Sequence, residues 1–369
     1  MSPTTSLYLE ILRFLAALAV FFLHVTFNGM TGGFLWQLGK FGSDAVMAFF
    51  VLSGFVIAFC AEHKHKSFTE YMVARFARLW SVALPAIAIT FVLDTTAGII
   101  NPSAELSSWN TEFTFQSIFA SALFVNQIWF LELVPGTNAP FWSIGYEFIY
   151  YVLFALAYYM RGAKRIILLA LGIVVAGPKI LLLFPIWLLG ALAYKATKLK
   201  IMPAIGWGTW VFSLLAIMIY YYFDVRGFLK SLVPAGKILD NGVFSNSDIL
   251  AKYLFAIIIF INIISFNIIS STFANLLNKN KHYIKSAAKY SFSLYLYHFP
   301  ILMFFKVIHM DSIGQWWQIA IMYIGTLGGV YILAIYTEPR KDDIAKFLNN
   351  LVNTWTLRRK SCVTNQAIK

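Results

Sequence analysis

Long apolar runs of about 20 residues recur along the whole chain, and short polar segments separate them. About 20 apolar residues in a helix span the hydrocarbon core of a bilayer. Thr4, Thr5 and Ser6 precede the first run and offer helix N-caps. The pattern therefore predicts an all-α polytopic membrane protein with about ten transmembrane helices, over residues 7–27, 41–61, 81–100, 141–160, 166–176, 180–194, 204–223, 249–270, 290–308 and 316–337.

A further apolar run, residues 113–133, lies in a stretch that lacks basic residues. Residues 79–160 contain no Lys or Arg, so this stretch holds an excursion to the outer side of the membrane. If 113–133 crossed the membrane fully, the basic turn at Arg161, Lys164 and Arg165 would lie outside. We therefore predict that 113–133 is a re-entrant or interfacial lid on the outer face.

Composition and charge support this topology and exclude other classes of protein. The chain is 60% hydrophobic and only 12% charged, whereas a soluble domain carries about 25% charged residues. Two cysteines, Cys60 and Cys362, provide no disulfide framework. The predicted inner segments hold 21 of the 29 Lys and Arg residues, which places both termini in the cytoplasm. The net charge of +13 thus reflects topology, and no nucleic-acid partner is expected.

The same analysis predicts a single membrane domain over residues 1–340. A basic cytoplasmic tail follows over 341–369 and is expected to be either a solvated helix or disordered. A polar outer loop is expected over 224–248.

The first predicted span contains two ionisable residues, Arg13 and His24. Eleven residues of helix turn the chain slightly past three full turns, so both side chains lie on one face, about 16 Å apart along the axis. Ionisable groups inside a span are costly and commonly functional. A cation near the inner end and an imidazole near the outer end suit a long ligand that lies along the helix. Glu10, one turn before Arg13, can pair with it. The alternative for each residue is a snorkelling Arg or a packed His.

Six short motifs, in order along nearly the whole chain, resemble those of the acyltransferase 3 family of membrane acyltransferases. They are Arg13 to His24 with ten residues between, 49–55 (FFVLSGF), 75–78 (RFAR), 141–147 (FWSIGYE) with Tyr150, 291–298 (SFSLYLYH) and 336–340 (YTEPR). The chain departs from the family pattern at Ala45-Val46-Met47, where Gly-Val-Asp is common, so Asp44 is displaced. The resemblance is to the stand-alone type, without an appended esterase-like domain.

The resemblance implies that acyl-CoA is the donor and that a glycan hydroxyl is the acceptor, on opposite faces of the membrane. Arg75 and Arg78 lie on adjacent parts of one helix face, and guanidinium groups bind phosphate by paired hydrogen bonds. The alternative is that both arginines only anchor to anionic lipid. Arg13 is expected to hold the pyrophosphate or pantetheine end of the donor or to stabilise negative charge. His298 is expected to line the donor tunnel or to be a packed histidine.

His24 is the best candidate for a general base, because a neutral imidazole can take the proton of a sugar hydroxyl. Nucleophilic catalysis through an acyl-imidazole is the alternative. Glu147 is expected to orient His24, to bind the acceptor, or to be a structural carboxyl. Trp142, Ser143 and Asp44 are candidates for acceptor binding, although Trp142 also fits an interfacial aromatic belt.

The expected function is therefore an O-acyltransferase of a bacterial inner membrane that moves acetyl from acetyl-CoA to O-antigen or another surface polysaccharide. The acceptor and the acetyl group rest on the family resemblance alone. A glycan or lipid transporter, with Arg13, His24 and Glu147 along a pathway, is the alternative, followed by a glycan polymerase. His63 and His65 lie in a polar loop, where no metal site is expected.

Overall fold

The computed structural model describes residues 1–102, 113–232, 248–309 and 315–366, with side chains described as far as Thr354 except at residues 28 and 309. The described residues are helical and contain no strand. Nine of the described helices are long and apolar enough to cross a membrane. An α-helix satisfies its backbone hydrogen bonds internally, which a segment in lipid requires. The predicted all-α polytopic fold is confirmed.

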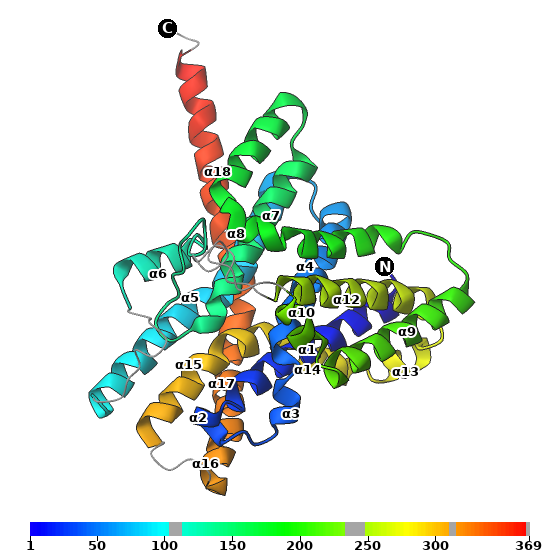
Figure 1. Ribbon diagram of the computed structural model, residues 1–369. Coiled ribbons are helices and arrows are strands. Elements are labelled where there is room, and N and C mark those ends of the chain that lie inside the picture. Colours follow the sequence, from blue (N-terminus) through cyan, green and yellow to red (C-terminus); the bar gives the residue numbers. More distant parts are fainter. Residues whose placement is uncertain (103–112, 233–247, 310–314, 367–369) are drawn as a thin grey trace.

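The helices form an elongated bundle in which segments far apart in the sequence lie side by side (Figure 1). Their bounds are α1 Pro3–Val25, α2 Asn28–Thr31, α3 Trp36–Gly39, α4 Gly42–His63, α5 Phe68–Ile100, α6 Phe115–Ala122, α7 Trp142–Tyr159, α8 Gly162–Ala196, α9 Pro203–Tyr222, α10 Val225–Ser231, α12 Ile249–Ile269, α13 Ala274–Lys279, α14 Lys281–Lys289, α15 Ser291–His309, α16 Trp316–Ala320, α17 Thr326–Thr337 and α18 Lys341–Gln366. A π-helical turn, Ile321–Gly325, joins α16 to α17.

The membrane-length helices in the described residues number nine rather than ten because the predicted spans 166–176 and 180–194 both belong to α8. Gly177 interrupts α8 with φ 74° and ψ 169°, a conformation that glycine tolerates best. A Cβ atom at Gly177 would also lie 2.8 Å from Cα of Trp129. The sequence therefore predicted the position of the break, while the structure joins the two halves without a loop.

The segment 113–133 folds around this break and is not a membrane-length helix. Its helix α6 has eight residues, and turns follow it. The Trp80 indole donates a hydrogen bond to the Ala122 carbonyl at 2.9 Å, and Lys179 Nζ donates to the Leu131 carbonyl at 2.7 Å. The segment thus packs against α5 and α8, and its depth in the membrane stays a prediction.

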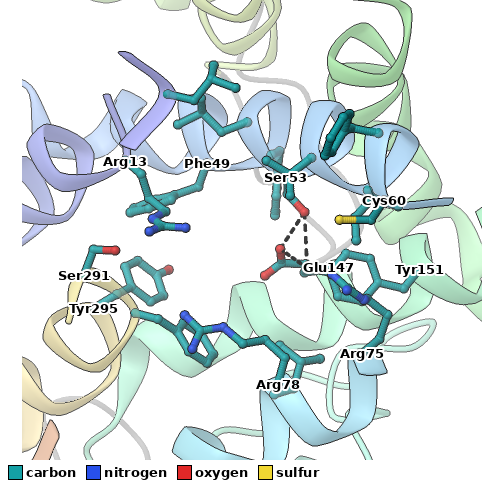
Figure 2. A pocket seen from close by; sticks show the side chains of 18 of the residues that line it. Arg13, Phe49, Ser53, Cys60, Arg75, Arg78, Glu147, Tyr151, Ser291 and Tyr295 are labelled. Atoms are coloured by element: carbon teal, nitrogen blue, oxygen red, sulfur yellow. Dashed lines mark hydrogen bonds between the residues drawn. The ribbon is translucent and has the colours of Figure 1, made fainter. Parts of the chain in front are cut away.

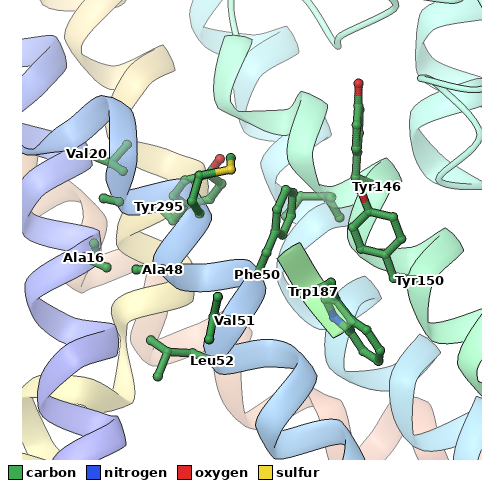
Figure 3. Packing of buried hydrophobic residues seen from close by; sticks show 14 of the residues in the cluster. Ala16, Val20, Ala48, Phe50, Val51, Leu52, Tyr146, Tyr150, Trp187 and Tyr295 are labelled. Atoms are coloured by element: carbon green, nitrogen blue, oxygen red, sulfur yellow. The ribbon is translucent and has the colours of Figure 1, made fainter. Parts of the chain in front are cut away.

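Helix α4 packs against α1, α8 and α12. It approaches α8 so closely that a Cβ atom at Gly54 would lie 2.0 Å from the Trp187 carbonyl oxygen. Around this contact, aromatic rings of α4, α7 and α8 pack together, among them Phe50, Tyr150 and Trp187 (Figure 3). Small residues at the crossing permit the backbones to approach, and the rings fill the space beside it.

The tail predicted over 341–369 forms α18, which packs against α5 and projects from the bundle (Figure 1). Cys362 and residues 367–369 of this tail lie outside the described side chains. The predicted outer loop 224–248 begins with α10, and its residues 233–247 lie outside the described residues. The cytoplasmic placement of both termini stays a prediction.

Candidate functional site

A cavity of about 320 Å³ lies between α1, α4, α5, α7 and α15, and charged side chains from several of these helices point into it (Figure 2). The charged residues that line it are Glu10, Arg13, Lys64, Arg75, Arg78 and Glu147. The lining thus carries four cations and two carboxylates. We call this site the basic cavity.

Two of its arginines have N–H groups that lack a partner in the described part of the chain. Arg13 Nη2 donates to the Ala288 carbonyl at 3.2 Å, but its Nε is buried without a hydrogen bond. Arg75 Nη2 lies 3.4 Å from His65 Nε2, and its Nε is likewise buried and unpaired. Burial and then the Arg75 charge lower the pKa of His65, so a neutral ring accepts this hydrogen bond. Buried donors without acceptors are uncommon and indicate a missing ligand or water.

Arg78, in contrast, is paired. Its guanidinium forms an ion pair with Glu338, which also accepts a hydrogen bond from Ser293 Oγ at 3.0 Å. The guanidinium lies 5.2 Å from the centre of the Phe292 ring. In the sequence, Glu338 was part of the motif 336–340. In the structure, a 3-10 turn at Glu338–Arg340 separates α17 from α18, and the Glu338 carboxylate holds α5 against α15. Pairing across 260 residues has no local signal in the sequence.

Glu147 lies in the basic cavity. Ser53 Oγ donates to Glu147 Oε1 at 2.6 Å, and the Tyr151 hydroxyl, one helical turn further along α7, donates to the same oxygen. The Trp187 indole donates to Ser53 Oγ at 3.2 Å. In the described residues both hydrogen bonds of Glu147 are to Oε1. The structure therefore places this carboxylate beside the arginines and not beside His24, which it was expected to orient.

His24 and His298 form a pair that the sequence analysis did not anticipate. His24 Nδ1 and His298 Nε2 are 2.9 Å apart, and His298 Nδ1 lies 2.7 Å from the Leu294 carbonyl oxygen. The ring of Phe299 packs against His24 with centroids 4.6 Å apart. Neither histidine is among the residues that line the basic cavity. Tyr295, one helical turn before His298, does line it, so the histidine pair lies about one turn beyond the cavity.

Ser143 and Trp142, adjacent in sequence, have different surroundings. Ser143 lines the basic cavity, where its Oγ lies 2.7 Å from the Tyr295 hydroxyl. Trp142 packs edge-on against Tyr146, with centroids 5.1 Å apart, and does not line the cavity. Ser143 and Tyr295 thus close the cavity on the side of the histidine pair.

Asp44 lies in a separate group of charges at the other end of α4. Its carboxylate accepts hydrogen bonds from Tyr220 at 3.2 Å and Tyr221 at 3.3 Å, and it lies 3.5 Å from Arg226. Arg226 also pairs with Asp248, which in turn pairs with Lys252 at 2.9 Å. We call these four charged residues the outer charge cluster. The structure does not bring Asp44 to the other candidate residues.

The site offers little for a metal ion, since the described residues contain no group of three or more His, Cys, Asp or Glu side chains that could hold one. Its distinctive feature is the set of arginines from α1 and α5, two helices that also approach α15. Guanidinium groups bind phosphate and carboxylate through paired hydrogen bonds. The guanidinium groups of the basic cavity are therefore suited to an anionic ligand.

Comparison with known proteins identifies the family. A family model described as an acyltransferase domain matches residues 6–335. The acyltransferase MdmB of Streptomyces mycarofaciens is 34% identical over 154 residues, which are 40% of this chain and 38% of that protein. An O-acetyl transferase of Shigella phage Sf6 is 26% identical over 285 residues, 75% of this chain and 79% of that protein. No solved structure matches. The family match covers nearly the whole length, and so this chain belongs to the acyltransferase 3 family.

Proposed function

We propose that this protein is a membrane O-acetyltransferase that moves acetyl from cytoplasmic acetyl-CoA to a hydroxyl of an envelope glycan. The observation that carries the proposal is the basic cavity, in which Arg13 and Arg75 have buried N–H groups without partners in the described residues. The phosphates of CoA supply the acceptors that these donors lack. Arg78 and Lys64 add positive charge around the same space.

The donor is positioned by residues of different helices. Arg75 and Arg78 hold the phosphates, and Arg13 holds the pyrophosphate end or the start of the pantetheine arm. Glu147 has one carboxylate oxygen engaged by Ser53 and Tyr151, and its other oxygen is suited to accept a hydrogen bond from a pantetheine amide N–H. The thioester then extends past Ser143 and Tyr295 to the histidine pair.

His24 acts as the general base. It takes the proton of the acceptor hydroxyl while the oxygen attacks the thioester carbonyl carbon. The C–S bond then breaks, the new ester leaves with the glycan, and the proton passes from His24 to the departing CoA thiolate. A polar group in a bundle of apolar helices is costly, and a catalytic role explains its presence.

The acceptor is proposed to be a lipid-linked O-antigen or another surface polysaccharide in a bacterial inner membrane. Support comes from the phage relative, whose name is O-acetyl transferase, and from the nine membrane-length helices in the described residues. Trp142 offers an aromatic face for a sugar ring near the start of α7.

The test is mass spectrometry of the surface glycans of cells that carry the wild-type protein, no protein, or the His24→Ala variant. We expect a base-labile acetyl mass that is present only with the wild-type protein. Membrane insertion of the variant is checked by protease protection, and CoA binding is measured on purified protein in nanodiscs. A correctly inserted His24→Ala protein that binds CoA but transfers nothing supports the role of the base.

Two outcomes would contradict the proposal. Full acetylation by His24→Ala would exclude His24 as the base. A glycan or lipid transporter needs no CoA. The transporter would therefore be favoured if the purified wild-type protein bound no CoA and cells without the protein lost a surface glycan entirely.

A further inference from the structure

We propose that His298 is a positioning residue that selects the reactive tautomer of His24, a role that rests on His24 acting as the base of the proposed acetyl transfer. The juxtaposition that points to this role is a chain of three groups: the Leu294 carbonyl, the His298 ring and the His24 ring. It differs from the expected role of His298 in lining the donor tunnel, because His298 does not line the basic cavity.

The direction of each hydrogen bond follows from the first group in the chain. A carbonyl oxygen only accepts, so the proton of the 2.7 Å contact belongs to His298 Nδ1. A neutral imidazole carries one proton, and His298 Nε2 is therefore an acceptor. Across the 2.9 Å contact, His24 Nδ1 must then donate. The lone pair of His24 is left on Nε2, where a base needs it.

The surroundings favour the neutral form of both rings. His298 is completely buried, and the ring of Phe21 contacts it edge-on with centroids 6.1 Å apart. Phe299 and Phe27 pack against His24 at centroid distances of 4.6 and 5.5 Å. A charged imidazolium without a carboxylate nearby would be costly among such groups. In the described residues, no ion pair involves either histidine.

The backbone provides the fixed reference for this arrangement. Leu294 lies one turn before His298 on α15, so its carbonyl and the ring keep the same relative position. Helices α1 and α15 pack against each other, which holds the two rings in contact. In general, the hydrogen bond that one ring nitrogen of a catalytic histidine makes sets the tautomer and the orientation of the ring.

The direct test reads the tautomer without turnover. Protein labelled with ¹⁵N-histidine is reconstituted in nanodiscs, and the ¹⁵N shifts and ¹⁵N–¹H couplings of each ring are measured by NMR. The His24 signals are assigned by their absence from His24→Gln. We expect His24 to carry its proton on Nδ1 in the wild-type protein. In His298→Leu the Val20 backbone remains as a hydrogen-bond partner of the His24 ring, and we expect a larger Nε2-protonated fraction than in the wild type. An Nε2-protonated His24 in the wild-type protein would overturn the proposal.

Three substitutions at residue 298 separate positioning from packing. The amide oxygen of His298→Gln reaches about as far as Nε2 and can accept from His24, while the shorter amide of His298→Asn reaches only the position of Nδ1. His298→Leu fills the space without any polar group. We expect Leu and Asn to lower kcat about 100-fold, near the lower end of what a general base contributes. His298→Gln should retain much of the wild-type kcat, and KM for acetyl-CoA should be unchanged in all three variants.

The outcomes distinguish this inference from the proposed function. Equal losses in Gln, Asn and Leu together with a raised KM for acetyl-CoA would overturn the positioning role and return His298 to the donor tunnel. Full activity of a folded His298→Leu would overturn it as well. A wild-type protein that shows no acetyl transfer refutes the proposed function instead, and the NMR tautomer still decides whether the hydrogen-bond chain exists.

Discussion

Two groups of charged side chains lie near opposite ends of α4, and they differ in how completely their charges are paired. In the outer charge cluster, Asp44 and Asp248 face Arg226 and Lys252, so two carboxylates meet two cations. In the basic cavity, four cations and two carboxylates line the space, and only Arg78 among these cations has an ion pair in the described residues, with Glu338. The Nε–H groups of Arg13 and Arg75 and one Glu10 oxygen are buried without partners in the described residues.

This difference in pairing corresponds to two roles: a charge cluster that stabilises the fold and one that is open to a ligand. A balanced cluster satisfies itself and joins the helices that contribute to it, here α4 and α12 together with α10. An unbalanced one leaves positive charge and open hydrogen-bond donors, which a polyanionic ligand completes. On this comparison, Asp44 holds the bundle together, and the arginines of the basic cavity are the proposed donor-binding residues.

The largest effect is expected on stability, from Arg226→Ala. Its removal leaves Asp44, whose side chain is only 1% exposed, without a cation, and breaking a buried pair costs about 3 kcal/mol. We expect a lower thermal unfolding midpoint in detergent and unchanged CoA affinity. The double variant Asp44→Asn, Arg226→Ala should recover part of the loss. A folded Arg226→Ala protein with weakened CoA binding would break the comparison.

The next largest effect is expected on CoA affinity, from Arg75→Ala. Loss of hydrogen bonds to a charged group costs about 1.5–3 kcal/mol, which is roughly a ten- to 100-fold weaker Kd for CoA. Arg75 has no ion pair within the described ranges, so the unfolding midpoint should change little. Arg161→Ala, an exposed arginine at the turn before α8, is the matched control and should bind CoA normally. Unchanged CoA affinity in Arg75→Ala would make Arg75 a lipid anchor.

A thiol reagent offers a third test, because Cys60 lines the basic cavity. In a Cys362→Ser background, Cys60 is the remaining cysteine, and its rate of maleimide labelling can be followed by mass spectrometry. CoA at ten times its Kd should slow labelling about tenfold by mass action. At the same CoA concentration, the ten- to 100-fold weaker Kd of Arg75→Ala should leave at most about twofold protection. Labelling that CoA does not affect would place the CoA site outside the basic cavity.

The smallest effect concerns acid stability of the outer charge cluster. Burial alone would raise the pKa of Asp248, but Lys252 and Arg226 outweigh it and lower that pKa below its ordinary value of about 3.9. A lowered folded-state pKa contributes stability above the ordinary value, and this is lost as the pH falls through the folded pKa. The wild-type unfolding midpoint should therefore fall more between pH 6 and pH 3 than that of Asp248→Asn. Equal slopes would contradict this pairing.

The sequence and the structure agree best where a property is local. Hydropathy identified the membrane-length helices, and the gap between the predicted spans 166–176 and 180–194 marked the break in α8, because apolar runs and helix breakers act over a few residues. The family motifs pointed to Arg13, Arg75 and Arg78, which do meet in one cavity. They also pointed to Glu147, but its expected neighbour His24 is replaced by Ser53 and Tyr151.

By itself, the sequence determined the all-helical membrane fold and the family and supplied the candidate site residues, because each depends on residue type and on spacing within one helix. Only the tertiary structure decided which of those residues are partners. Arg78 with Glu338 and His24 with His298 are contacts between helices more than 250 residues apart in the chain. Such contacts depend on how each helix is rotated and tilted against its neighbours, which side-chain packing across the whole bundle determines.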